Sequence, residues 1–182
     1  MGPAHGYNHF GTWLASSSRR RSGNDAPNLL DFRALVLEGI SSFYRNGGND
    51  TIYGTAHDDM IAGGTGNDTL SGGAGADIFR FTAAADSTRT ARDVITDFDP
   101  ARGDRIDLSA IDARSDLPGD QTFTFGGFST APQRGQVTYV VFGGGTGALV
   151  VGDVNGDGVV DFQIELIAVN GPLTLTAADF IL

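Results

Sequence analysis

The chain has 182 residues, 27 glycines, no cysteine and a formal net charge of −10. This length fits one domain, or one domain with appendages, and the lack of cysteine excludes disulfides and thiolate metal sites. The acidic charge disfavours nucleic acid and anionic lipid as partners and favours cations. The sequence contains no run of 18 apolar residues, so no membrane span is predicted.

The N-terminal part divides into two predicted segments. Residues 1–27 are polar and contain a serine- and arginine-rich stretch, which predicts a flexible leader. Residues 1–10 lack the charged and apolar regions of a secretory signal peptide, so an export address, if the protein leaves the cell, is expected elsewhere. In residues 28–44, Leu29, Phe32 and Ile40 fall near one helical face and Asn28 stands in a capping position. This spacing predicts a helical cap on whatever follows.

Residues 45–80 form four consecutive nine-residue units: 45–53, 54–62, 63–71 and 72–80. Each unit has an aspartate at its sixth position and a bulky apolar residue at its eighth. The aspartates are Asp50, Asp59, Asp68 and Asp77, and the apolar residues are Ile52, Ile61, Leu70 and Phe79. A fixed short period predicts stacked coils of short strands, with the apolar residues in a narrow core.

The turns between these strands are candidate calcium sites. Carboxylate and carbonyl oxygens in flexible geometry suit calcium better than zinc or copper. If two units make one coil, Asp50 and Asp68 stack on one edge, and Asp59 and Asp77 on the other. Further ligands are expected from turn residues, and Asp86 and Asp93 are candidates for closing the outer sites. The turn residues are Asn46, Gly48, Gly64, Gly66, Gly73 and Gly75.

Energetics favour a bound cation over a metal-free array. One large apolar side chain per unit stabilises the array by less than ordering nine residues costs, and stacked carboxylates repel one another. Calcium binding is therefore expected to be coupled to folding. The alternatives are a disordered glycine-rich linker or a turn-rich sheet without metal. Unit two carries Thr55 and His57 where glycine is expected, and unit one carries Arg45 and Asn46, so weaker binding is expected on the edge of unit two.

Residues 81–182 predict a mostly antiparallel β region that supplies most of the hydrophobic core. Alternating apolar residues separated by turn signals predict short strands. The predicted strands are 93–98, 105–109, 122–125, 136–142, 148–154 and 162–169, with the first two forming a strand–turn–strand unit.

The repeats resemble RTX calcium-binding repeats. Together with the stretches 75–81, 86–87, 93–98 and 104–109, they resemble the C-terminal module of serralysin metalloproteases and the R-modules of secreted mannuronan epimerases. The resemblance covers residues 45–182. It implies an all-β fold with a short right-handed parallel β-roll, structural calcium, an extracellular location in bacteria, and export by a type I secretion apparatus.

The chain end fits that resemblance. Asp179, Phe180, Ile181 and Leu182 form an acidic residue followed by terminal apolar residues, which resembles the uncleaved signal of such exported proteins. An ordinary last strand is the alternative, and both descriptions can hold together.

A second acidic motif lies near the C-terminus. Asp153, Asn155, Asp157 and Asp161 match the start of an EF-hand loop, but Ile164 stands where a bidentate acid is required. The same residues also predict a hairpin turn between two strands. We favour the hairpin over a weak calcium site.

No catalytic constellation is present in the sequence. His5, His9 and His57 are the only histidines, and their spacing does not match the zinc-protease motif. The leading hypothesis is an extracellular calcium-binding module that folds after secretion. The alternatives are a non-catalytic C-terminal module of a secreted metalloprotease or polysaccharide-modifying enzyme, with an upstream enzyme domain or a glycan as partner, or a small adhesin.

Overall fold

The computed structural model describes residues 25–34 and 41–182, and their regular elements are β-strands and short 3-10 turns. No helix in these residues is long and apolar enough to cross a membrane. The strands are β1 Leu29–Asp31, β2 Ser41–Tyr44, β3 Thr51–Tyr53, β4 Asp59–Ala62, β5 Thr69–Ser71, β6 Ile78–Arg80, β7 Val94–Phe98, β8 Arg105–Asp107, β9 Thr124–Phe128, β10 Gln136–Phe142, β11 Gly147–Gly152, β12 Phe162–Ala168 and β13 Phe180–Ile181. The short turns are η1 Ala84–Asp86, η2 Pro100–Arg102, η3 Gly143–Gly145 and η4 Ala177–Asp179.

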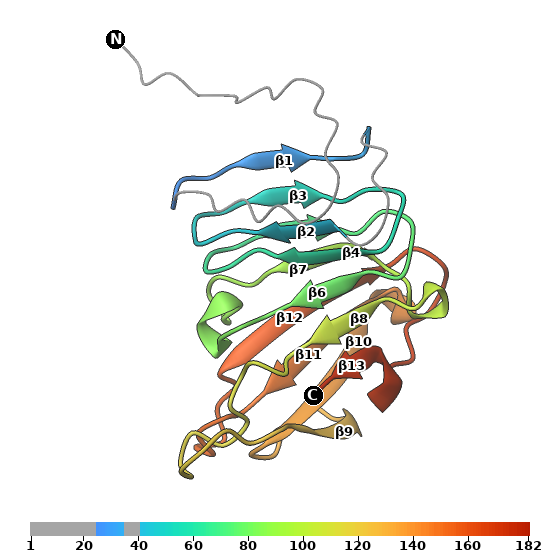
Figure 1. The fold of residues 1–182 in the computed structure, drawn as a ribbon. Helices are drawn as coiled ribbons and strands as arrows, with labels where there is room; N and C mark the ends of the chain where they lie inside the picture. The colour runs from blue at the N-terminus through green and yellow to red at the C-terminus, as the bar shows by residue number, and fades with distance from the viewer. Residues whose placement is uncertain (1–24, 35–40) are drawn as a thin grey trace.

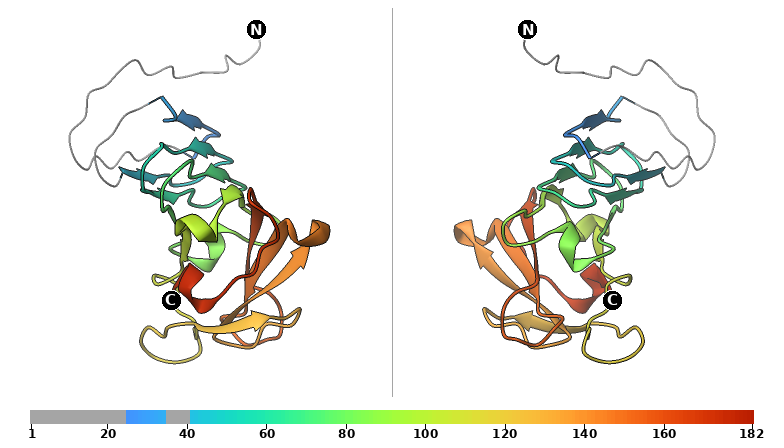
Figure 2. Two further views of the ribbon diagram at one scale, coloured as in Figure 1. Left: turned by 90° about the vertical axis from the view of Figure 1, so that its right-hand side faces the viewer. Right: turned by 90° about the vertical axis from the view of Figure 1, so that its left-hand side faces the viewer.

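Successive strands from β1 to β8 alternate between two sheets, as the coils of a β-roll do. One sheet has the order β1-β3-β5-β7-β12-β11-β10-β9, and the other β13-β8-β6-β4-β2. All neighbouring strands among β1–β8 pair in parallel. Figure 1 shows these strands stacked from the N-terminal end downward, and Figure 2 shows the two layers from the side. The predicted all-β, β-roll class is confirmed.

One inward-facing side chain per strand builds the core of the roll. Because side chains alternate between the faces of a strand, only the middle residue of a three-residue strand points inward. Strand register stacks these residues in two columns. One column is Leu30, Ile52, Leu70 and Ile95, and the other is Phe43, Ile61, Phe79 and Ile106; all but Leu30 are buried.

The predicted helical cap at 28–44 is wrong over the described residues. β1 and β2 occupy the two ends of this segment, and residues 35–40 lie outside the described part, as does most of the predicted leader. Leu30 and Phe43 extend the two core columns, and the rings of Phe32 and Phe43 stack at 4.1 Å. Pairing with the exposed edges of β3 and β4 therefore overrides the helical spacing of the apolar residues.

The roll continues beyond the repeats and then merges with an antiparallel unit. β7 pairs with β5, whereas β8 pairs with β6, so residues 99–104 are another turn of the roll between two sheets and not a hairpin turn. Antiparallel pairing occurs in β10–β11–β12, and β12 joins this unit to the roll by pairing in parallel with β7. Aromatic residues such as Phe123 and Phe162, whose rings meet edge to face at 5.6 Å, fill its core.

Candidate metal centre

Aspartates of alternate turns stack in a hydrogen-bonded column on one edge of the roll, here called ladder A. The Asp50 N–H donates to Oδ1 of Asp68 at 2.7 Å, and the Asp68 N–H donates to Oδ1 of Asp93 at 2.9 Å. Asn28 tops the column, since its N–H donates to Oδ1 of Asp50 at 2.8 Å. The expected stacking of Asp50 on Asp68 is therefore present, and Asp93 extends it.

The opposite edge carries a second column, ladder B. The Asp59 N–H donates to Oδ1 of Asp77 at 2.9 Å, and the Asp77 N–H donates to Oδ1 of Asp104 at 2.9 Å. The other oxygen of Asp104 accepts the N–H of Asp99 at 2.9 Å. Ladder B thus ends in the Asp104 carboxylate, and each of its two oxygens accepts a hydrogen bond from a backbone N–H group.

In ladder A each carboxylate keeps a buried oxygen without a donor. The Oδ2 atoms of Asp50, Asp68 and Asp93 have no hydrogen-bond partner, and these residues are at most 1% exposed. An uncompensated buried carboxylate is strongly unfavourable, so such an oxygen fits a position beside a bound cation or a proton. The arrangement fits a cation that binds oxygen ligands.

Burial raises the pKa of the ladder carboxyl groups. Loss of solvation is the main cause in each case, and neighbouring aspartates add to it. The pKa rises to about 9 for Asp93, about 7 for Asp77, and about 6 for Asp68 and Asp104. Protons and cations therefore compete for the same buried oxygens.

Glycines allow each turn to approach the main-chain carbonyls of the turn stacked beside it closely. A Cβ on Gly66, where φ is +146°, would lie 2.0 Å from the Gly48 carbonyl oxygen. A Cβ on Gly73 would lie 2.1 Å from the Thr55 carbonyl oxygen. The same holds for Gly64 against the carbonyl of Asn46 and for Gly75 against that of His57. The turn residues expected to supply carbonyls are thus stacked in pairs.

No group of three or more His, Cys, Asp or Glu side chains that could hold an ion occurs in residues 25–34 and 41–182. A calcium ion at these turns would therefore draw on main-chain carbonyls as well as on carboxylates. Calcium accepts six to eight oxygens of either kind, so the donor set fits it. Zinc, which prefers nitrogen and sulfur ligands, does not fit.

Unit two replaces part of this arrangement with side-chain hydrogen bonds. The N–H and the hydroxyl of Thr55 both donate to Oδ2 of Asp59, at 2.6 and 3.0 Å, and Thr55 is buried. The His57 N–H donates to the Thr55 hydroxyl at 3.1 Å. These donors occupy an oxygen that a cation would otherwise use, which supports the expectation of weaker binding on this edge.

The two aspartates proposed to close the outer sites have different places. Asp93 belongs to ladder A. One oxygen of Asp86 accepts from the Thr82 N–H and hydroxyl and from the Ala83 N–H, which closes the turn before η1. Its charge nevertheless raises the pKa of both Asp68 and Asp93, so it lies near the lower end of ladder A.

Sequence reasoning missed Asn28 and Asp104 as members of the ladders. Each stands two residues before an inward-facing apolar residue, Leu30 or Ile106, as every repeat aspartate does. Asp93 and Ile95 follow the same rule. The sequence signal of a ladder position is an Asp or Asn residue followed two positions later by an apolar residue. It was overlooked at Asn28 and Asp104 because no glycine pair flanks them.

The acidic loop at 153–161 connects β11 and β12, whose register pairs Gly152 with Phe162, so the predicted hairpin is confirmed. The two oxygens of Asp153 accept the N–H groups of Gly156 and Gly158. One oxygen of Asp161 accepts the N–H groups of Val154 and Asn155. The acidic side chains thus accept hydrogen bonds from the main-chain N–H groups of their own loop.

The chain end is folded. Oδ2 of Asp179 accepts the N–H and hydroxyl of Thr176, and Phe180 is 3% exposed where β13 pairs with β8. The alternative of an ordinary last strand is therefore correct, and the secretion role of residues 179–182 remains a prediction. A signal of this kind would be accessible only before β13 docks.

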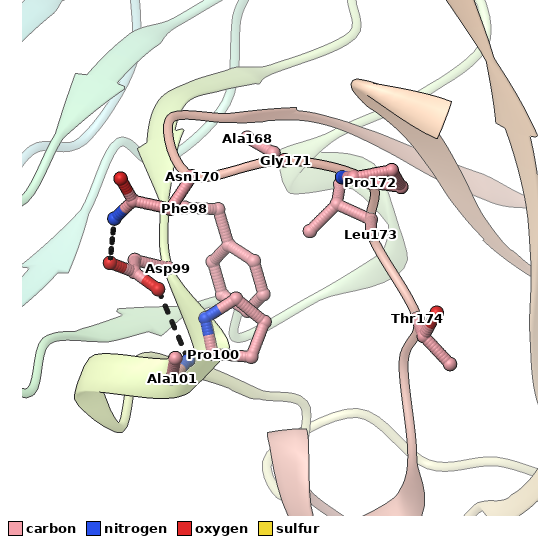
Figure 3. A pocket seen from close by; sticks show the side chains of 10 residues that line it. All are labelled: Phe98, Asp99, Pro100, Ala101, Ala168, Asn170, Gly171, Pro172, Leu173 and Thr174. Carbon is pink, nitrogen blue, oxygen red and sulfur yellow. Dashed lines mark hydrogen bonds between the residues drawn. The ribbon is translucent and has the colours of Figure 1, made fainter. Parts of the chain in front are cut away.

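A small cleft of about 190 Å³ lies where residues 98–101 meet residues 168–174 (Figure 3). Asp99 is its charged residue. One oxygen accepts the Ala101 N–H at 3.1 Å, and the other accepts from the Asn170 side chain and pairs with Arg102 at 3.0 Å. The carboxylate therefore fastens the 168–174 segment to the roll.

Comparison with known proteins agrees with this architecture. The family described as peptidase M10 serralysin C terminal matches residues 47–182. The chain belongs to this family. A search of curated proteins gave no match.

Two solved structures are similar to the chain over most of its length. The solution structure of the AlgE6R2 subunit of the Azotobacter vinelandii mannuronan C5-epimerase shares 27% identity with a TM-score of 0.63, over 90% of this chain and 92% of that one. The AlgE6R3 subunit of the same enzyme shares 28% identity with a TM-score of 0.51, over 80% and 72%. The resemblance to serralysin C-terminal modules and epimerase R-modules is confirmed, and both comparisons are with parts of larger enzymes. They favour the accessory-module alternative over a stand-alone calcium protein.

Proposed function

We propose that this member of the serralysin C-terminal family is a non-catalytic module of a secreted enzyme, and that calcium orders its roll after export. The observation that carries the calcium part is the pair of buried Oδ2 atoms of Asp68 and Asp93, which have no hydrogen-bond donors. The family match and the similarity to epimerase subunits support the module part.

A bound calcium ion would supply positive charge at the turns and would be coordinated by oxygen atoms of the chain. Asp68 and Asp93 on ladder A, and Asp59 and Asp77 on ladder B, would offer the carboxylates. The carbonyls of Asn46, Gly48, Thr55 and His57 would offer the remaining oxygens, because glycines keep the next turn on the same edge close to them. Asp86 lies near the lower end of ladder A and is a further candidate ligand.

This coupling suits a protein that crosses membranes unfolded. Extracellular calcium modules bind with affinities of about 10⁻⁴ to 10⁻³ M. The roll would therefore stay unfolded at low cytosolic calcium and fold outside the cell. Residues 179–182 would be readable by a type I secretion apparatus while β13 is undocked, and would then close the sheet beside β8.

A calcium titration tests the folding claim. Hydrogen exchange of the full chain is measured in EGTA, in millimolar calcium, and in magnesium as the control cation. We expect the amides of β4–β6 to lose protection in EGTA and to regain it in calcium, with little effect of magnesium because it requires a smaller octahedral site. Equal protection of these strands in EGTA and calcium would refute calcium-coupled folding.

A secretion assay tests the export claim separately. The full chain and a variant lacking residues 180–182 are expressed with a bacterial type I apparatus, and the medium is assayed for each. We expect the full chain alone to appear outside. Export of both forms, or of neither, would contradict a signal at the chain end.

A further inference from the structure

Arg45 is an arginine whose side chain lies inside the first turn of ladder A. The side chain is 11% exposed, and its Nε is buried without a hydrogen-bond partner. The Nε lies 4.0 Å from Oδ2 of Asp50, which also has no hydrogen-bond partner and belongs to a fully buried side chain. A positive group thus faces the donor-free oxygen of the topmost ladder aspartate.

The other three units have glycine at the position of Arg45. A Cβ on Gly63 or Gly72 would lie 2.1 or 2.2 Å from Oδ2 of that unit's own aspartate, and one on Gly54 would lie 2.7 Å away. In those turns the carboxylate fills the space beside the first residue. Arg45 has a Cβ and a long side chain at this place, so the first turn cannot repeat the geometry of the others.

The surroundings of Asp50 are also distinct on its other side. Asn28, a neutral residue, donates to Oδ1 of Asp50 through its N–H and its side-chain amide, at 2.8 and 3.2 Å. Below it, the Arg45 charge acts on Asp68 as well, where it opposes the raised pKa. The top of ladder A therefore contains one carboxylate, one permanent cation and a neutral cap.

We propose that Arg45 is a built-in counter-ion that takes the place of a calcium ion at the top of ladder A. The guanidinium neutralises Asp50 and repels a divalent ion from the space between Asp50 and Asp68. Calcium binding on this edge then begins at the level of Asp68 and Asp93, and the first coil of the roll is ordered without metal. This inference rests on the proposed calcium-binding function.

Removal of the charge is expected to create or strengthen a calcium site. Arg45→Gly restores the glycine of the other units, Arg45→Gln keeps much of the side-chain length without the charge, and Arg45→Lys keeps the charge. Calcium binding to each full-length variant is measured by isothermal titration calorimetry. We expect Arg45→Gly and Arg45→Gln to bind at least one additional calcium ion or to tighten the weakest site by about tenfold or more, and Arg45→Lys to match the wild type.

Arg80→Gln is the matched control. The Arg80 Nε is likewise buried without a hydrogen bond, but it pairs with Asp107 at 3.5 Å on the strands, away from the turns. This variant loses the same charge and should bind calcium as the wild type does. Unchanged stoichiometry and affinity in both Arg45→Gly and Arg45→Gln, or an equal change in Arg80→Gln, would overturn the proposal.

Hydrogen exchange in EGTA provides a second readout. Arg45→Gln should lose protection in β3 without metal and recover it in calcium, whereas the wild type should keep part of that protection in EGTA. Equal β3 protection in the two proteins in EGTA would also overturn the proposal. A wild type that binds no calcium in the titration would instead refute the proposed function.

Discussion

The roll and the antiparallel unit β10–β12 share one eight-stranded sheet but are stabilised in different ways. In the repeat units each strand contributes one inward-facing apolar residue, and the turns bury carboxylates that lack donors. In the antiparallel unit several inward residues of each strand are buried, and its one buried aspartate, Asp153, has donors for both oxygens. The first region therefore buries carboxylates that a cation or a proton has to neutralise, whereas the second is built from apolar burial and satisfied hydrogen bonds.

The largest expected effect comes from the strand that joins the two regions. Leu166 on β12 is fully buried and pairs with Ile95 on β7 and with Ala148 on β11. Leu166→Ala should lower the free energy of unfolding by about 2–5 kcal/mol because it leaves a cavity in the shared core. Urea unfolding in saturating calcium measures it.

Val169→Ala is the control, since Val169 is 49% exposed. It should change the free energy of unfolding by less than about 0.5 kcal/mol. A Leu166→Ala variant that destabilises only one region would show that β12 does not couple them.

The next effect concerns the calcium response of the roll. Asp68→Ala with Asp77→Ala removes one shared carboxylate from each ladder. We expect the calcium concentration at the folding midpoint to rise by more than about tenfold, since each lost ligand weakens a site by a kcal/mol or more. A calcium titration followed by circular dichroism measures the midpoint.

Asp120→Asn, an exposed aspartate outside both ladders, should leave the midpoint unchanged. Hydrogen exchange of the double variant should show the loss in β3–β6 and retained protection in β10–β12. Loss of protection in both regions would remove the distinction between them.

The pH dependence of the metal-free protein gives a third test. The ladder carboxyl groups have raised pKa values when folded, about 6 for Asp68, about 7 for Asp77 and about 9 for Asp93, against an ordinary value of 3.8. The folded roll thus holds protons that the unfolded chain releases. These groups therefore make the metal-free roll most stable below pH 4, and their contribution to its stability is lost as pH rises toward 9.

In EGTA we therefore expect more β structure in the roll at pH 5 than at pH 8, and in calcium the opposite trend, because the metal requires ionised carboxylates. Circular dichroism across this range measures both. A metal-free roll that gains order between pH 5 and pH 8 would contradict the assignment of buried, donor-free carboxylates.

The sequence predicted the repeat strands and the stacking of their aspartates because nine-residue spacing alone sets both. The sequence-based prediction failed where ladder positions and roll strands are built from residues outside the nine-residue pattern. Asn28 and Asp104 occupy ladder positions without glycine pairs, and the apolar residues of 28–44 fit a helix as well as two short strands. Pairing with β3 and β4 decides between these, and that is a tertiary effect which local spacing does not contain.

One substitution in each ladder tests whether the two ladders differ in their need for a cation. Asp93→Asn should weaken calcium binding yet stabilise the metal-free roll, since it removes a desolvated carboxylate. Asp104→Asn should destabilise the roll by about 1–2 kcal/mol with or without calcium, because an amide can keep only one of the N–H bonds from Asp77 and Asp99.

Urea unfolding of both variants in EGTA and in calcium separates these effects. The opposite signs in EGTA are the decisive feature. If both variants lost stability in EGTA by the same amount, the donor-free oxygen of Asp93 would have no special role.

The smallest effect is expected in the hairpin loop of the antiparallel unit. Asp153→Ala removes the acceptors of the Gly156 and Gly158 N–H groups, and both can turn to water because neighbouring loop residues are exposed. The cost should be about 1 kcal/mol. It should be equal in EGTA and in calcium, since Asp153, Asn155, Asp157 and Asp161 already satisfy the loop without an ion. A loss that appears only in calcium would instead make this loop a metal site, and the antiparallel unit would then depend on cations as the roll does.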